Sequence, residues 1–179
     1  GVGSFSDYRG ALDFSGPLNE SGTALYRLNA AYRNFDNFLD FDEGREFSIA
    51  PNVAFKLGQN TDLTVEGDVN VLERNMQQPE GQPAEGTVLP NPNGEISRSF
   101  NAAGPQDDNL TVNGRVGYRF EHRFNENLKL RNAFLYTFYD DGDSIGIFNG
   151  SLADDNRTLN RRFFDGSQFF DNYYLDTNL

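Results

Sequence analysis

The chain has 179 residues, of which 37% are hydrophobic, and it carries a formal net charge of -12. Its lack of cysteine excludes a disulfide framework, a thiolate metal site and a cysteine nucleophile. The acidic balance argues against a nucleic-acid-binding protein, because contacts with phosphates need a basic face. The sequence has no run of about 18 apolar residues that could form a membrane helix.

Long runs of the sequence alternate between apolar and polar residues, a period of two that is typical of β-strands. The first run stops at Gly16-Pro17, because proline cannot donate to a ladder. For the same reason Pro51, inside the third run, predicts a bulge or a poorly paired position. We expect strands over residues 7–15, 23–35, 45–57, 62–74, 109–124, 128–139 and 167–179.

The connections between these runs alternate in length. Short connections are expected at 16–22, 58–61 and 125–127, and long ones at 34–44, 75–108 and 140–166. Outer-membrane barrels have short turns at one end and longer loops at the other. The strands also exceed the usual 5–6 residues of soluble domains and reach the ~9–11 that a tilted membrane strand needs. The fold class predicted is therefore all-β, an antiparallel meander of long strands that forms part of a transmembrane β-barrel.

Two of the long connections have alternative interpretations. The segment 34–44 carries four acidic residues, which could hold a calcium ion or could be solvated loop charge. The segment 75–108 contains five prolines and no sustained period. It is either a binding loop or lid, or a surface insertion.

The polar side of the strands is rich in arginine, opposite an aromatic stripe. In a barrel the apolar face meets lipid and the charged face meets the lumen. The residues predicted to face the lumen, or a plug inside it, are Arg27, Arg115, Arg119 and Arg131. Seven strands leave two free edges, which cannot exist in hydrocarbon. We therefore expect the chain to be part of a larger closed barrel.

Nothing in the sequence predicts catalysis. His122 is the only histidine, which makes a Ser-His-Asp site formally possible. However, it lies on the apolar face beside a turn, which favours an interfacial, lipid-headgroup or turn-packing role. Phosphate loops, dinucleotide fingerprints and zinc signatures are also missing. We predict that the protein is not an enzyme and has no cofactor or resident metal.

Several stretches resemble the early barrel region of TonB-dependent ferric-siderophore receptors of the ferrichrome-type branch. The order and the intervals of these stretches match across nearly the whole chain. They are residues 2–4, 12–18, 26–28, 49–51, 86–88, 92–94, 116–118, 121–124 and 130–132.

The resemblance implies that residues 1–179 supply about seven strands of a 22-stranded barrel in the bacterial outer membrane, without the plug domain. The partners that it implies are a ferric siderophore as transported ligand, the receptor's own plug, the TonB complex and outer-membrane lipid. The ligand-binding residues that it implies are Phe148, with Met76, Arg98 and Phe100 as further candidates. The stretch 77–82 departs from the family because it has no aromatic residue.

Two other classes of function share parts of this pattern. A passive porin or small barrel would have similar strands but would lack the matches in the loops. A soluble acidic β-sandwich that binds carbohydrate or calcium would have similar loops but would not need strands of this length.

Overall fold

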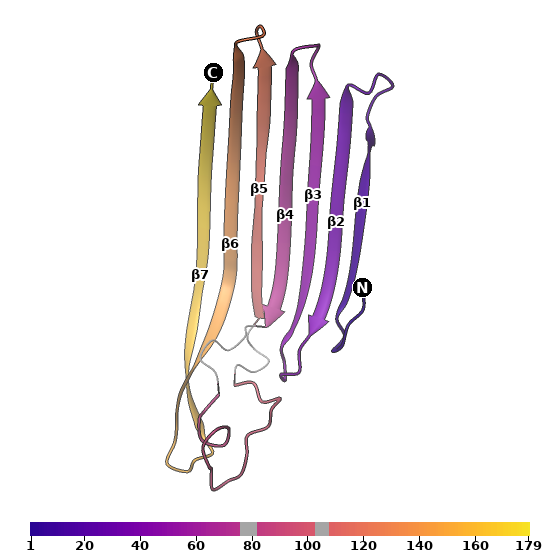
Figure 1. The fold of residues 1–179 in the computed structure, drawn as a ribbon. Coiled ribbons are helices and arrows are strands. Elements are labelled where there is room, and N and C mark those ends of the chain that lie inside the picture. The colour runs from indigo at the N-terminus through magenta and orange to yellow at the C-terminus, as the bar shows by residue number, and fades with distance from the viewer. Residues whose placement is uncertain (76–81, 103–107) are drawn as a thin grey trace.

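The structure is a computed structural model that describes residues 1–75, 82–102 and 108–179, without the side chains of 108, 143–146 and 148–149. Seven strands form one antiparallel sheet in chain order, which confirms the predicted meander (Figure 1). None of the described segments is a helix long and apolar enough to cross a membrane. The strands are β1 (Tyr8–Pro17), β2 (Ala24–Asp36), β3 (Glu43–Lys56), β4 (Thr61–Asn75), β5 (Asp108–Arg123), β6 (Lys129–Leu152) and β7 (Leu159–Asn178).

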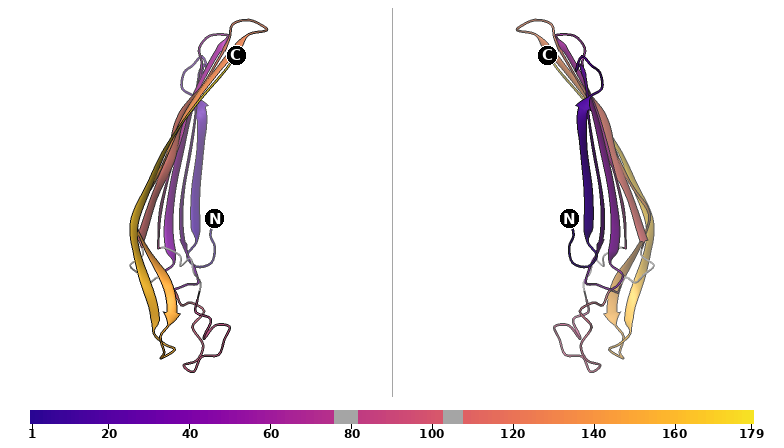
Figure 2. Two further views of the ribbon diagram at one scale, coloured as in Figure 1. Left: turned by 90° about the vertical axis from the view of Figure 1, so that its left-hand side faces the viewer. Right: turned by 90° about the vertical axis from the view of Figure 1, so that its right-hand side faces the viewer.

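The sheet is a single curved layer (Figure 2). Within the described residues, the only buried hydrophobic side chains are Ala24, Ala102 and Ile147. Leu12 and Leu175, on the apolar face of the two outermost strands, are 60% and 70% exposed. A sandwich would bury this face against a second sheet. The β-sandwich alternative is therefore wrong for the part of the chain that the structure describes.

The apolar face is a band of defined width. On β3 it runs from Phe47 to Phe55, and on β4 from Leu63 to Val71, which is nine residues on each strand. A membrane-spanning strand needs ~9–11 residues. At the end with the longer connections the band is closed by Arg45 and Glu73, which lie opposite each other in the ladder. The width of this band therefore matches the hydrocarbon layer.

The short turns step regularly along the sheet. One row of paired residues runs through Pro17, Ala54 and Arg119. The first turn begins at this row, the second begins two residues beyond it at Lys56, and the third four residues beyond it at Arg123. Each strand is thus displaced by about one residue relative to its neighbour. With a rise of about 3.3 Å per residue and a distance of about 4.8 Å between neighbouring strands, this displacement corresponds to a strand tilt of about 35°. Transmembrane barrels have tilts of about 35–45°.

Two predicted long connections are shorter in the structure than the sequence suggested. The connection predicted over 34–44 is reduced to 37–42, and the one predicted over 140–166 is a hairpin whose turn is 153–158. The last strand accordingly begins at Leu159 and not near residue 167. The prediction was wrong here because backbone pairing continues where the side chains no longer alternate. Irregularities in the β6–β7 register, between Asp141 and Ser144 and between Asn149 and Leu152, hid the period.

Pro51 lies inside β3 and pairs with Leu28 of β2. On its other side the β3–β4 ladder stops at Ile49 and resumes at Asn52 in the same register. The predicted poor pairing is confirmed, whereas the predicted bulge is wrong. A proline lacks only the N–H, so it interrupts one ladder without shifting it.

Candidate functional site

The polar face of the sheet carries ion pairs between neighbouring strands. Each of the four arginines predicted for this face lies against a carboxylate of the adjacent strand. The pairs are Arg27 with Asp13 at 2.7 Å, Arg119 with Glu66 at 2.9 Å, Arg131 with Glu121 at 3.2 Å, and Arg115 with Asp68. The four arginines therefore share one face, as predicted, but none of them is an unpaired cation.

An aromatic ring of β2 lies between two arginines on this face, at the end of the sheet that carries the connection 37–42. Phe35 lies between two guanidinium groups, with the Arg33 carbon 4.8 Å and the Arg74 carbon 5.5 Å from its ring centroid. Arg74 also forms an ion pair of 3.1 Å with Asp42, whose side chain is only 1% exposed. The second carboxylate oxygen of Asp42 accepts a hydrogen bond of 2.7 Å from Asn37. Asp42 thus fixes the loop 37–42 to the sheet, which supports a structural role for this acidic group.

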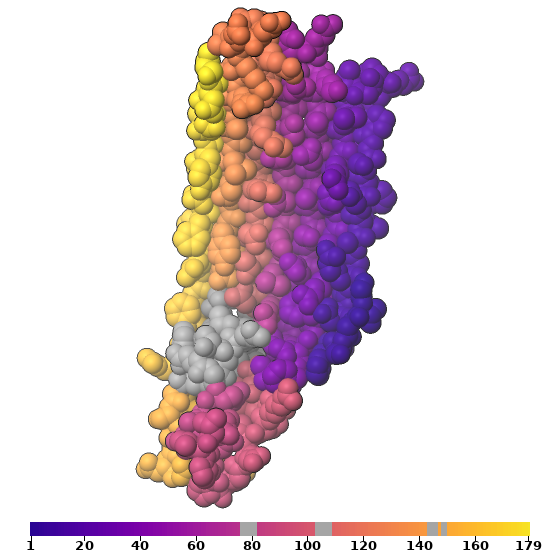
Figure 3. All heavy atoms as spheres, viewed as in Figure 1, coloured from indigo at the N-terminus to yellow at the C-terminus, as the bar shows by residue number. Residues whose placement is uncertain are grey.

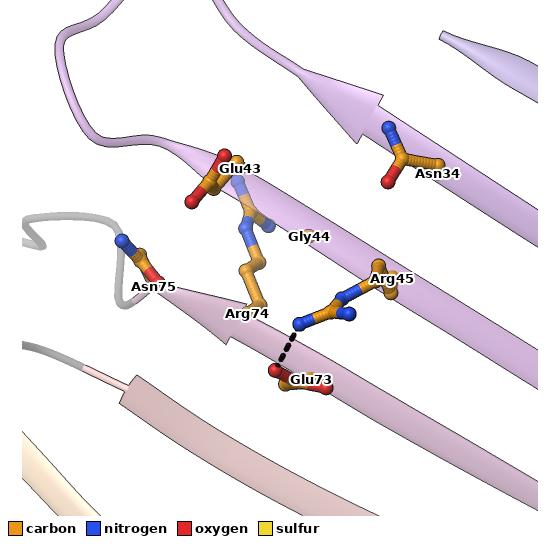
Figure 4. A pocket seen from close by; sticks show the side chains of 7 residues that line it. All are labelled: Asn34, Glu43, Gly44, Arg45, Glu73, Arg74 and Asn75. Atoms are coloured by element: carbon orange, nitrogen blue, oxygen red, sulfur yellow. Dashed lines mark hydrogen bonds and ion pairs between the residues drawn. The ribbon is translucent and has the colours of Figure 1, made fainter.

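A hollow of about 260 Å³ opens at the ends of β2, β3 and β4 (Figure 4). Its two arginines are both engaged by carboxylates, Arg45 by Glu73 at 2.6 Å and Arg74 by Asp42. Because both arginines are paired with carboxylates, neither is a free cation that could hold an anion.

The segment 82–102 has a defined internal structure. Gly86 adopts a positive φ of 89°, and a Cβ at this position would lie 2.9 Å from Ile96. The Gly86 carbonyl accepts a hydrogen bond of 2.7 Å from the Ile96 amide, and the Gly86 amide donates to the Leu89 carbonyl at 2.8 Å. These bonds fold the segment back on itself and give residues 82–102 a defined turn structure.

This segment is bound to the tip of the β6–β7 hairpin, beside which it lies in Figure 1 and Figure 3. The Asn91 amide donates to the Asn156 carbonyl at 2.9 Å, and the Asn93 amide donates to the Asp155 carbonyl at 3.0 Å. At the other end of the segment, Arg161 donates to the Ala102 carbonyl at 2.6 Å.

The same segment is also bound to the connection 37–42 between β2 and β3. The Asp40 amide donates to the Ser99 carbonyl at 2.7 Å, and the Ser99 hydroxyl donates to the Asp40 carboxylate at 3.2 Å. The Arg98 guanidinium lies 4.9 Å from the centroid of the Phe38 ring. The three connections at this end of the sheet therefore form one assembly, in which the segment 82–102 is the bridge.

Asp155 organises the turn at the tip of the hairpin. Its carboxylate accepts hydrogen bonds from the Arg157 amide at 2.9 Å, the Thr158 amide at 2.8 Å and the Thr158 hydroxyl at 2.6 Å. The Thr158 hydroxyl, followed by these amides, lowers the pKa of Asp155 from 3.8 to about 2. The turn that holds Asn91 and Asn93 is thus built on an ionised carboxylate.

Of the four predicted ligand-binding residues, Arg98, Phe100 and the backbone of Phe148 lie at this end of the sheet. Arg98 is exposed and Phe100 is half-buried, with its carbonyl accepting a hydrogen bond of 2.5 Å from Gln82. Phe148 lies in β6 opposite Arg162, but its side chain is outside the described residues, as is all of Met76. The structure therefore brings Arg98 and Phe100 into one segment and places the backbone of Phe148 in the neighbouring hairpin.

The bonds that assemble these connections were missed in the sequence. Asn91-Pro92-Asn93-Gly94 is a recognisable turn pattern, but nothing in it indicates that the two asparagines bind residues 155 and 156. His122, at the opposite end of the sheet, has an interaction of its own. Its Nδ1 lies 2.7 Å from the Thr61 hydroxyl, and its ring contacts Phe124 edge-on. These contacts agree with the predicted turn-packing role.

Comparisons with known proteins place this geometry in context. No family model matches the chain. The chain is 34% identical over 168 residues to the metal-pseudopaline receptor of Pseudomonas aeruginosa, which covers 90% of this chain and 22% of that receptor. It is 29% identical over 141 residues to the ferrichrome outer membrane transporter and phage receptor of Escherichia coli K12, which covers 75% of this chain and 18% of that protein.

A solved structure is similar over almost the whole chain. The crystal structure of the ferripyoverdine receptor of the Pseudomonas aeruginosa outer membrane, bound to ferripyoverdine, matches with a TM-score of 0.80 and 25% identity. The match covers 98% of this chain and 23% of that structure. The chain thus spans less than a quarter of the length of these relatives. They are receptors and transporters, not enzymes, which confirms that part of the prediction.

Proposed function

Because this chain belongs to the family of TonB-dependent outer-membrane siderophore receptors, we propose that it forms part of the barrel wall of a receptor that takes up a metal chelate. Its relatives are named for metal-pseudopaline, ferrichrome and ferripyoverdine. A ferric siderophore is accordingly the proposed ligand, and TonB the proposed source of energy.

Residues 1–179 are proposed to be seven consecutive strands of a 22-stranded barrel, with the plug domain elsewhere in the receptor. The outer edge of β1 supports this proposal. The Gly1 nitrogen donates to the Arg9 carbonyl at 2.7 Å, and the Arg9 amide donates back to the Gly1 carbonyl at 2.9 Å. Such an exchange is the start of a further antiparallel ladder.

The observation that carries the proposed function is the assembly of the connections at one end of the sheet. The segment 82–102 is hydrogen-bonded both to the connection 37–42 at Asp40 and to the hairpin tip at Asp155. An ordered surface of this kind, over a sheet with a lipid-matched apolar band, is suited to capturing a ligand at the mouth of a barrel. Phe148, Met76, Arg98 and Phe100 are proposed to contact the chelate there.

The test is uptake by the full receptor, expressed in a strain that lacks other siderophore receptors, with and without TonB. Radioactive iron is supplied as ferrichrome, ferripyoverdine and ferrioxamine, and metal-pseudopaline is tested in parallel. We expect TonB-dependent uptake of at least one chelate. Replacing Arg98 or Phe100 by alanine should reduce its affinity about 10-fold if a contact of about 1.4 kcal/mol is lost.

Passive entry of small solutes without TonB, together with no chelate uptake, would establish the porin alternative instead. The reading frame around this segment gives an independent check of the domain organisation. We expect a plug-like domain upstream and about fourteen further strands downstream, the remainder of a 22-stranded barrel. A frame that encodes only these seven strands would refute the receptor.

A further inference from the structure

The dipeptide Asn-Gly occurs in the chain at residues 93–94, 113–114 and 149–150, and the asparagine side chain of the last pair is outside the described residues. An asparagine followed by glycine reacts readily with its own backbone, because glycine has no Cβ to obstruct the approach. From the surroundings of the first two pairs we propose that Asn93 is a site of spontaneous deamidation, and that its conversion releases the segment 82–102 from the β6–β7 hairpin. This inference goes beyond the proposed function and does not depend on the chelate.

The glycines of these two pairs lie in opposite surroundings. Gly94 is exposed, and no described atom lies within 4 Å of a Cβ built at this position. Gly114 is buried in β5 and is paired with Val69 on one side and with Phe138 on the other. A Cβ at Gly114 would collide with the Asp68 carbonyl oxygen. The backbone therefore has room to rearrange at Gly94 and has none at Gly114.

Both reacting groups of the first pair are hydrogen-bonded while the segment is docked beside the hairpin (Figure 1). The Gly94 amide donates to the Asn91 carbonyl at 3.0 Å, which closes a turn around Asn93. The Asn93 side-chain amide donates to the Asp155 carbonyl at 3.0 Å, in a bond that is exposed to solvent. Exposed bonds of a surface connection open at a low free energy. Such local opening frees both groups to react.

The reaction needs water as its co-reactant. In the opened segment the Gly94 backbone nitrogen attacks Cγ of Asn93, so that a bond forms between these two atoms and the bond from Cγ to Nδ2 breaks. The proton of the Gly94 amide leaves with Nδ2 as ammonia, and a cyclic succinimide remains. Water then opens this ring at either of its carbonyl groups, which gives aspartate or isoaspartate.

Either product removes the bond to the hairpin. Nδ2 of Asn93 is the donor of that bond, whereas both products carry a carboxylate, which when ionised only accepts hydrogen bonds. The new carboxylate would face the Asp155 carbonyl oxygen, in a residue whose own carboxyl group has a pKa of about 2 and is ionised. Isoaspartate also lengthens the backbone by its Cβ atom. Conversion therefore replaces an attraction between the segment and the hairpin by a repulsion.

The test incubates the full receptor in detergent at a mildly alkaline pH, which promotes loss of the Gly94 amide proton. Peptide mapping by mass spectrometry measures conversion at Asn93 and at Asn113, and enzymatic methylation identifies isoaspartate. The receptor unfolded in guanidinium chloride gives the reference rate, because the fold then protects neither position. We expect conversion at both positions in the unfolded receptor, and at Asn93 but not at Asn113 in the folded one.

Two variants connect the conversion with the bond to the hairpin. Asn91→Ala removes the bond to Asn156 and a second bond to the Asn93 amide. It should speed conversion at Asn93 about 10-fold, because each lost hydrogen bond favours the open segment by about 2- to 10-fold. Asn93→Gln keeps a side-chain amide but cyclises far more slowly. Amide hydrogen exchange of residues 82–102 should accelerate after incubation of the native receptor and should stay unchanged after incubation of Asn93→Gln.

Persistence of Asn93 in the folded receptor, over the time in which the unfolded receptor converts, would overturn the inference. Equal conversion of Asn93 and Asn113 in the folded receptor would also overturn it, because the fold would then not select the site. Conversion of Asn93 without faster exchange of residues 82–102 would refute the release of the segment. None of these results bears on the proposed function, which chelate uptake tests separately.

Discussion

Asn93 donates its side-chain amide to the backbone carbonyl of Asp155 at 3.0 Å, although 62 residues separate the two in sequence. Together with the hydrogen bond from the Asn91 side chain to the Asn156 carbonyl, it joins the segment 82–102 to the tip of the β6–β7 hairpin. The loop end of this sheet is therefore not a set of independent loops, and its order can be tested bond by bond.

Replacing both Asn91 and Asn93 by alanine should release the segment 82–102 from the hairpin. Each hydrogen bond contributes about 0.5–1.5 kcal/mol, so local opening should increase by about one order of magnitude. Amide hydrogen exchange of residues 82–102 in the full receptor measures this. Glu95→Gln, an exposed position in the same segment, is the control and should exchange as the native protein does. Unchanged protection in the double variant would show that the two bonds do not hold the segment.

The turn at Asp155 should be sensitive to acid. Its folded pKa is about 2 and its unfolded value is 3.8, so the stabilisation by the ionised carboxylate is complete above the unfolded value. That stabilisation is lost as the pH falls through the folded pKa of about 2. Exchange protection of the Arg157 and Thr158 amides should decline over this range. Asp155→Asn keeps an acceptor but cannot ionise, and its protection should be independent of pH; an identical acid response would implicate another group.

Gly114 is a position where a side chain should not fit. A Cβ there would collide with the Asp68 carbonyl oxygen and would lie 2.8 Å from the Phe138 ring. Overpacking of this kind costs about 1–3 kcal/mol, so Gly114→Ala should lower the thermal unfolding temperature of the barrel. Gly10→Ala is the matched control, because nothing lies within 4 Å of a Cβ at Gly10. Equal melting temperatures for the two variants would contradict the contact at Gly114.

Arg74→Ala should loosen the connection 37–42. The Asp42 carboxylate, 1% exposed, would lose its cation, and an under-satisfied buried charge costs about 1–3 kcal/mol or more. Hydrogen exchange of residues 37–42 should accelerate accordingly. Arg45→Ala breaks a pair whose members are both about half-exposed, and exposed pairs contribute little. If the two variants behaved alike, burial of Asp42 would not be what holds the connection.

The strand segments within the apolar band could be predicted from the sequence. A strand with one face in hydrocarbon and the other in water must alternate between apolar and polar residues. This alternation is why the stretches 47–55 and 63–71 can be predicted as strands from the sequence. Beyond the membrane this constraint is absent. The outer parts of β6 and β7 therefore pair without a period, and the sequence suggested a loop there.

The sequence by itself determined the fold class, the two faces of the sheet and the family, because these depend on patterns within single strands and on local turn residues. Only the tertiary structure decided which charges neutralise each other and which connections touch. Arg115 and Asp68 are 47 residues apart, and Asn93 and Asp155 are 62. Such pairings depend on strand register and on the path of the connections. The identity of a hydrogen-bonding residue does not indicate which distant group it will bind.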